Sequence, residues 1–94
     1  YHDLWINGQR VSDEVLAPAY TKYDARIAYV THDVTRFLVD GENTIGVVLG
    51  NGFFNQHARD VWDFHRAPWR APPRLLLQLH AKTTAGEIVV TSDE

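Results

Sequence analysis

Residues 33–53, with the sequence DVTRFLVDGENTIGVVLGNGF, constrain the fold most, because several different local signals follow one another within them. Asp33 or Thr35 has the short oxygen-bearing side chain that satisfies free backbone N–H groups where a helix starts. The apolar positions of Val34–Leu38 have the spacing of one face of a helical turn. We therefore predict one short helical turn near Val34–Leu38 rather than a long helix.

A turn and a strand follow this helical turn. Gly41 lies among the turn-forming residues Asp40–Asn43, where glycine adopts positive φ without steric cost. Thr44–Leu49 is apolar and rich in β-branched residues, which predicts a strand covered on both faces. Residues 50–52, Gly-Asn-Gly, permit either a simple sharp turn or a close approach to another group, and the sequence leaves both interpretations open.

The N-terminal residues predict a β-hairpin. Asn7-Gly8 is a strong signal for a two-residue type I′ turn, because both positions of that turn need positive φ. The apolar run Leu4–Ile6 precedes the turn, and residues 9–11 form the returning strand. A two-stranded hairpin is marginal in isolation. We therefore expect Tyr1 to continue an earlier strand, so that the chain lacks the first strand or strands of its domain.

Further strands are predicted along the chain. Apolar residues alternate along Ala25–Thr31 and along Leu75–Ala81, as in strands. Glu87–Thr91 is expected to pair with the second of these as a hairpin, across a turn at residues 84–86. Short strands separated by turn signals predict an all-β fold, an antiparallel β-sandwich that is jelly-roll-like. Three aromatic side chains are expected in its core: Trp5, Tyr29 and Phe37.

Composition limits the class of protein. At 94 residues the chain forms one domain or part of one, and its hydrophobic content of 45% is typical of a globular protein. The net charge of −3 argues against nucleic acid as a partner, which usually needs a basic patch. The sequence has no cysteine, which excludes disulfides and thiol chemistry. It also has no apolar run long enough to span a membrane.

Three consecutive segments cover almost the whole chain: WINGQRV, then DEVLAPAYTKYDARIAYVTHDVTRFLVDGENTIGVVLGNGFF, then PRLLLQLHAKTTAGEIVVTSDE. In this order and at this spacing they resemble the N-terminal β-sandwich domain of bacterial α-L-rhamnosidases. The most specific parts are LAPAYTKYDARIAYVTHDVT and GENTIGVVLGNGFF. The Asn-Gly hairpin is weaker, because it also occurs in the jelly-roll domains of β-galactosidase-like enzymes.

The resemblance implies that residues 1–94 form a single, truncated accessory domain of a larger glycoside hydrolase. That parent enzyme would hydrolyse terminal α-L-rhamnosyl residues with acidic groups in a downstream (α/α) barrel, so we expect no catalytic residue in this chain. The accessory sandwich is expected either to bind sugar, in some members with a calcium ion, or only to brace the barrel. Expected partners are rhamnose-containing glycans and neighbouring domains, and a periplasmic or secreted parent is favoured.

The connection Asn55–Pro73 carries most of the reactive and aromatic side chains. A connection of this length is unusual in a compact domain and is often functional. Aromatic faces stack on sugar C–H surfaces, while Arg, Asp and Asn side chains bond hydroxyl groups, and such mixtures are typical of binding sites. The candidate carbohydrate-binding residues, which include one residue just before the connection, are Asn51, His57, Arg59, Asp60, Trp62, Asp63 and Trp69.

Two other interpretations of this connection stay open. Its aromatic side chains are equally suited to burial against a neighbouring domain, because aromatic residues and Arg dominate interfaces. A zinc site is less favoured than ordinary salt-bridged polar residues, because the candidate ligands have no established spacing. Those candidates are His57, Asp60, Asp63 and His65.

Asp13 and Glu14 are the other acidic residues of interest. Adjacent residues on a loop usually diverge, so they form a poor acid–base pair for a glycosidase, which needs two carboxylates across a cleft. As hard oxygen donors they are candidates for calcium binding together with Asn51, against the simpler alternative of solvated surface acids. Ser12 and Ser92 are the only serines, and neither lies in a Gly-x-Ser-x-Gly motif, so nucleophilic catalysis is not supported.

Overall fold

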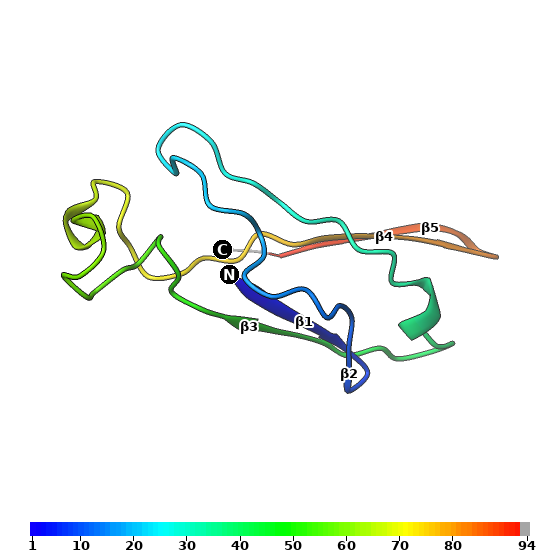
Figure 1. Ribbon diagram of the computed structural model, residues 1–94. Helices are drawn as coiled ribbons and strands as arrows, with labels where there is room; N and C mark the ends of the chain where they lie inside the picture. The colour runs from blue at the N-terminus through cyan, green and yellow to red at the C-terminus, as the bar shows by residue number, and fades with distance from the viewer. Residues whose placement is uncertain (93–94) are drawn as a thin grey trace.

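The computed structural model describes residues 1–92 and is all-β, with two small antiparallel sheets and two isolated 3-10 turns (Figure 1). This confirms the predicted fold class, while the jelly-roll order of strands stays a prediction. Within the described residues, no helix is long and apolar enough to cross a membrane. The elements are β1 (His2–Ile6), β2 (Gln9–Arg10), η1 (Thr35–Phe37), β3 (Ile45–Leu49), η2 (Phe64–Arg66), β4 (Gln78–Thr83) and β5 (Gly86–Thr91).

The first sheet has the strand order β2-β1-β3. β1 and β2 form the predicted hairpin, with Trp5 opposite Arg10, and its turn has φ of 51° at Asn7 and 78° at Gly8. These two positive φ values are what a type I′ turn requires, so the Asn-Gly signal is confirmed. β3 lies antiparallel on the other side of β1 and pairs with it along its whole length.

The side chain of Asn7 links the hairpin turn to η1 and to the residues just before β3. Its Nδ2 donates to the Phe37 carbonyl at 2.9 Å and to Asn43 Oδ1 at 2.8 Å. Its Oδ1 accepts from the Thr44 backbone N–H at 2.9 Å. Because these bonds join residues far apart in the sequence, Asn7 sets where β3 begins relative to β1.

The core lies between this sheet and η1. Its buried apolar residues are Ile6, Val11 and Phe37, with exposed fractions of 1%, 7% and 7%. η1 confirms the predicted helical turn, and Asp33 Oδ1 accepts from the Thr35 backbone N–H at 3.0 Å and from its hydroxyl at 2.7 Å. These two bonds lower the pKa of Asp33, since they favour its charged form.

The second sheet is the predicted hairpin of β4 and β5, in which Gln78 pairs with Thr91 and Thr83 with Gly86. β4 begins at Gln78, so Leu75–Leu77 precede the strand that was expected to include them. Every residue of β5 is exposed. This sheet therefore presents apolar side chains to solvent on both of its faces.

Several sequence-based expectations are wrong. Ala25–Thr31 is not a strand, because no described strand pairs with it, and Ile27 and Tyr29 are 71% and 87% exposed. Trp5 is 39% exposed and so lies outside the core. β3 is not covered on both faces, since Val48 is 62% exposed. An alternating or continuous apolar sequence pattern indicates that a segment can be buried. It does not indicate whether another strand or loop is present to cover that segment.

The molecule is elongated. Its radius of gyration is 15.9 Å and its principal extents are 51 × 23 × 19 Å, whereas a compact domain of this length has a radius of gyration of about 12 Å. Figure 1 shows the cause, because the aromatic connection lies at one end, η1 lies toward the other, and the two sheets run lengthwise. A shape of this kind leaves much of the apolar surface uncovered.

Candidate functional site

Residues 50–52 lead from β3 to the aromatic connection, Asn55–Pro73, and lie beside the start of the chain. The Gly50 backbone N–H donates to the Tyr1 carbonyl at 2.9 Å. At Gly52 φ is +50°, and a Cβ added there would lie 2.8 Å from the Tyr1 ring. The two interpretations of this glycine pair therefore both apply at Gly52, which turns the backbone and also approaches a ring closely.

Phe64 is at the centre of a set of packed rings, which we call the aromatic cluster. Its ring centroid lies 5.5 Å from that of Tyr20, 5.2 Å from that of Phe53 and 6.3 Å from that of Trp69. Most pairs meet edge to face, the arrangement that aromatic quadrupoles favour. Burial raises the pKa of Tyr23, and the nearby Tyr1 and Tyr20 add to this. The members of the aromatic cluster are Tyr20, Tyr23, Phe53, Phe54, Phe64 and Trp69.

Trp62 differs from the other aromatic residue of the predicted carbohydrate site. Its side chain is 86% exposed, and its backbone has a φ of +38°. Trp69 is half-buried in the aromatic cluster, where its ring centroid lies 5.8 Å from that of Tyr23. Trp62 meets only the edge of the aromatic cluster, with its ring centroid 6.1 Å from that of Phe64. Trp69 is therefore occupied in packing, while most of the Trp62 ring is uncovered and available to a sugar or a protein surface.

The polar residues of the predicted carbohydrate site separate into two groups. His57 lines an open basin of about 470 Å³, and its Nδ1 lies 2.7 Å from Arg70 Nη2. Arg59, Asp60 and Asp63 are exposed and do not line the basin. The lining residues are Asn55, His57, His65, Arg66, Ala67, Arg70, Ala71 and Pro72.

Asn51 precedes the connection and does not itself line the basin, but it is hydrogen-bonded to Asn55, which does. Its Oδ1 accepts from Asn55 Nδ2 at 3.0 Å and its carbonyl accepts from the Asn55 backbone N–H at 3.1 Å. Arg70 was not among the predicted site residues, although it lies between two of the prolines of the connection. Tyr20 and Tyr23 were also missed, since nothing in their irregular segment indicates that Tyr20 contacts Phe64 or that Tyr23 contacts Trp69.

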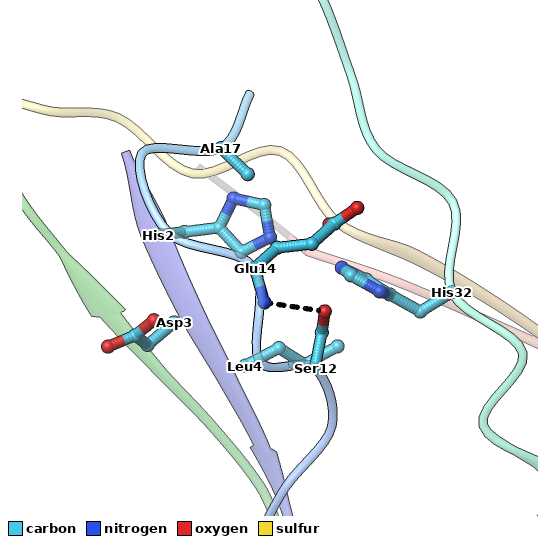
Figure 2. A pocket seen from close by; sticks show the side chains of 7 residues that line it. All are labelled: His2, Asp3, Leu4, Ser12, Glu14, Ala17 and His32. Carbon is cyan, nitrogen blue, oxygen red and sulfur yellow. Dashed lines mark hydrogen bonds between the residues drawn. The ribbon is translucent and has the colours of Figure 1, made fainter. Parts of the chain in front are cut away.

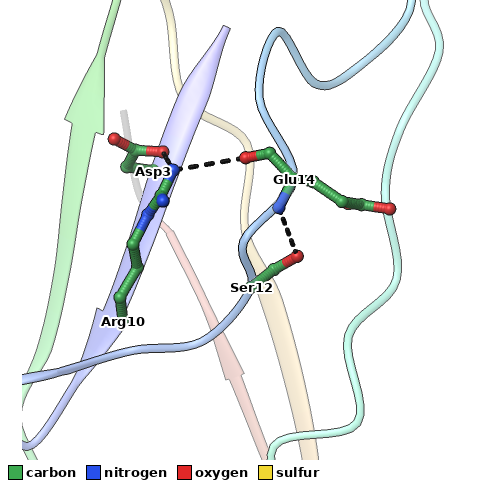
Figure 3. Close-up of polar contacts among 4 residues, drawn as sticks. All are labelled: Asp3, Arg10, Ser12 and Glu14. Carbon is green, nitrogen blue, oxygen red and sulfur yellow. Dashed lines mark hydrogen bonds and ion pairs between the residues drawn. The ribbon is translucent and has the colours of Figure 1, made fainter.

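The predicted calcium residues Asp13 and Glu14 lie on the exposed segment after β2. Figure 3 shows Arg10 placed between Asp3 and the backbone of Glu14, with Nη2 2.6 Å from Asp3 Oδ1 and 3.2 Å from the Glu14 carbonyl. The Glu14 backbone N–H donates to Ser12 Oγ at 3.1 Å. The backbone at Glu14 is thus engaged with Arg10 and Ser12, whereas its carboxylate has no hydrogen bond or ion pair among residues 1–92.

A narrow space beside these residues is shown in Figure 2, where the rings of His2 and His32 meet edge to face with centroids 5.8 Å apart. Its volume of about 10 Å³ holds at most one water molecule. Burial lowers the pKa of His2, and His32 and the amino terminus lower it further. The space therefore excludes a sugar, and it is lined by His2, Asp3, Leu4, Ser12, Glu14, Ala17 and His32.

Within residues 1–92, no group of three or more His, Cys, Asp or Glu side chains is placed to hold a metal ion. That observation disfavours zinc at His57, Asp60, Asp63 and His65. It does not address a calcium site made from two acids and Asn51, which stays a prediction.

Comparison with known proteins gives a consistent result. The family model of the α-L-rhamnosidase N-terminal domain matches residues 1–94. Two α-L-rhamnosidases of Formosa agariphila are similar to the chain, one 46% identical over 57 residues (61% of this chain and 6% of the relative) and one 36% identical over 91 residues (89% and 9%). An α-L-rhamnosidase of Streptomyces avermitilis is 32% identical over 85 residues, which is 90% of this chain and 8% of the relative. No solved structure matches the chain.

Proposed function

Because the chain belongs to the family of α-L-rhamnosidase N-terminal domains, we propose that it is an accessory domain that packs against the rest of an α-L-rhamnosidase. The chain spans less than a tenth of the length of the relatives described above. In this proposal the parent enzyme removes terminal α-L-rhamnosyl residues with an acid and a base outside this chain. Hydrolysis of an aryl rhamnoside by the chain alone would overturn that part.

The exposed apolar surface of the second sheet carries the proposal. Ile88, Val89 and Val90 of β5 are 50%, 49% and 46% exposed, and Leu76 just before β4 is 92% exposed. Adjacent strand residues point to opposite faces, so both faces of the hairpin are apolar. Fully burying such a side chain is worth about 1.5–3 kcal/mol. A partner that covers the hairpin therefore gains several such contributions.

The shape and the small core support the same role. The buried apolar core consists of three residues in the described chain, and the radius of gyration of 15.9 Å is well above that of a compact domain of this length. Domains of this size are already marginally stable when compact. Additional burial against the parent enzyme would add to the modest stability that a chain of this size has by itself.

The test is to place a charge on each face of β5 in the parent enzyme, with Ile88→Lys and Val89→Lys as separate variants. We expect at least one to lower the thermal unfolding midpoint of the parent by several degrees, because a buried charge is costly. Val15→Lys is the matched control, since Val15 is 74% exposed and lies outside the hairpin. If both hairpin variants unfold at the wild-type temperature, the packing role is wrong.

A second candidate function, sugar contact, is favoured by the exposure of Trp62. The test is to titrate L-rhamnose into the domain, with and without calcium, and to monitor binding by tryptophan fluorescence. We expect a saturable change that Trp62→Ala abolishes and that Trp69→Phe, a variant inside the aromatic cluster, retains. Absence of any change in both conditions would remove sugar contact from the proposed function and leave packing alone.

A further inference from the structure

The basin is lined in part by two arginines, Arg66 and Arg70, and by two histidines, His57 and His65. Its other lining residues are uncharged, and none of the lining residues is acidic. The chain as a whole has a net charge of −3. Asp60 and Asp63 of the same connection do not line the basin, so its lining carries the positive charge of the two guanidinium groups.

Arg70 is held in position before any ligand arrives. Its Nη1 donates to the His65 carbonyl at 3.2 Å, and its Nη2 lies 2.7 Å from His57 Nδ1. A guanidinium group only donates hydrogen bonds, so His57 Nδ1 is the acceptor and the imidazole proton is on Nε2. These two bonds leave further N–H groups of Arg70 free, and their fixed geometry reduces the entropy lost on binding.

Arg66 adds a second cation at the rim of the same basin. It is exposed, and among residues 1–92 its side chain has no hydrogen bond or ion pair. Guanidinium groups match the paired oxygens of carboxylate, sulfate and phosphate groups, and such charge-assisted bonds are stronger than neutral ones. Two guanidinium groups at one basin therefore suit an oxyanion better than a neutral hydroxyl group.

We propose that this basin binds the carboxylate or sulfate group of an acidic saccharide, with Arg70 as the fixed donor and Arg66 as the mobile one. The basin volume of about 470 Å³ falls within the range of about 300–1,000 Å³ that small-molecule sites occupy. The choice of a saccharide rests on the proposed function, whereas the choice of an anion rests only on the basin. The ligand and its residues differ from those proposed for neutral sugar at Trp62.

The experiment measures binding to the chain by calorimetry with four probes: glucuronate, glucose 6-sulfate, neutral glucose and inorganic sulfate. We expect at least one of the two anionic sugars to bind at least tenfold more tightly than both glucose and inorganic sulfate. Equal binding of the anionic sugars and glucose, or no binding of either anionic sugar, would overturn the proposal. If inorganic sulfate binds as tightly as both anionic sugars, the basin recognises the anion alone, and the proposal that its ligand is a saccharide is overturned.

Variants assign the binding to the basin. Arg70→Gln and, separately, Arg66→Gln should each weaken binding of the anionic sugar at least tenfold, while Arg74→Gln, just beyond the basin, should not. Arg66→Gln keeps the test valid if Arg70→Gln fails to fold, because Arg66 has no side-chain bond to lose. Unchanged affinity of Arg66→Gln for the anionic sugar would overturn the proposal. Absence of binding in the parent enzyme would also overturn it, because a carboxylate of a neighbouring domain would then occupy the basin.

Discussion

The two ends of the molecule are held together by different means. At one end, β1, β2, β3 and η1 are joined by a backbone ladder, the bonds of Asn7 and the core around Ile6. At the other end, the aromatic cluster and its connection have no strand among the described residues and pack ring against ring. The first end is a framework that local signals specify, whereas the second uses side-chain contacts and leaves polar groups free for a partner.

The largest effect is expected from the core of the framework. Ile6→Ala should lower the free energy of unfolding by about 2–5 kcal/mol, because it leaves a cavity at a side chain that is buried on all sides. Urea unfolding followed by circular dichroism measures this, and Ile6→Val, at about 0.5–1.5 kcal/mol, keeps the change measurable if the first variant unfolds. Ile27→Ala is the matched control at an exposed isoleucine. A loss at Ile27 as large as at Ile6 would contradict the assignment of the core.

The next effect is expected at the hairpin turn. Asn7→Ala removes three hydrogen bonds, each worth about 0.5–1.5 kcal/mol. It also places at positive φ an alanine, which has no side-chain hydrogen bond to stabilise that conformation. We expect a total loss of about 2–4 kcal/mol. Asn7→Gly keeps the turn conformation and should be less damaging by about 1 kcal/mol. Equal stability of Asn7→Gly and the wild type would show that the side-chain bonds contribute nothing.

The aromatic end gives a paired test of two tryptophans. Trp69→Ala should cost about 1–3 kcal/mol, since Trp69 meets two rings and each aromatic pair is worth about 0.5–1.5 kcal/mol. Trp62→Ala should cost less than about 1 kcal/mol, because Trp62 is 86% exposed and its contact is with Phe64 alone among the rings of the aromatic cluster. If Trp62→Ala is the more damaging variant, the separation of packing and exposed rings is wrong.

The smallest effect is expected from pH. Burial lowers the pKa of His2 below its ordinary 6.5, so the folded state binds this proton less tightly than the unfolded state. The contribution of neutral His2 to stability is thus fully present above pH 6.5 and is lost as pH falls through its folded-state pKa. His2→Gln should make the free energy of unfolding less dependent on pH between pH 8 and pH 5. An unchanged or steeper dependence would contradict the burial of His2.

Sequence signals predicted the framework and the separate β4–β5 hairpin well, because these signals act over a few residues. The type I′ turn at Asn7-Gly8, the helical turn at η1 and the β4–β5 hairpin each follow from local backbone preferences. The strand predicted at Ala25–Thr31 failed because pairing needs a partner, which no local pattern supplies. The cover expected over β3 failed for the same reason.

The candidate site was less predictable than the framework. Composition identified the connection that holds His57 and Trp62, but it did not show that Trp69 packs inward or that Arg70 joins His57 at the basin. Contacts across many residues of irregular chain determine both outcomes. Tyr20, which comes from a distant segment to pack on Phe64, is the clearest example, since no spacing rule connects the two.

The proposed packing requires that the parent enzyme covers the apolar hairpin of β4 and β5. Hydrogen–deuterium exchange of the β5 backbone amides, compared between the chain alone and the parent enzyme, measures this cover. We expect exchange at Ile88–Val90 to slow at least tenfold in the parent, because a partner then excludes water from the hairpin and suppresses its opening. Equal exchange rates in the chain and in the parent would contradict it.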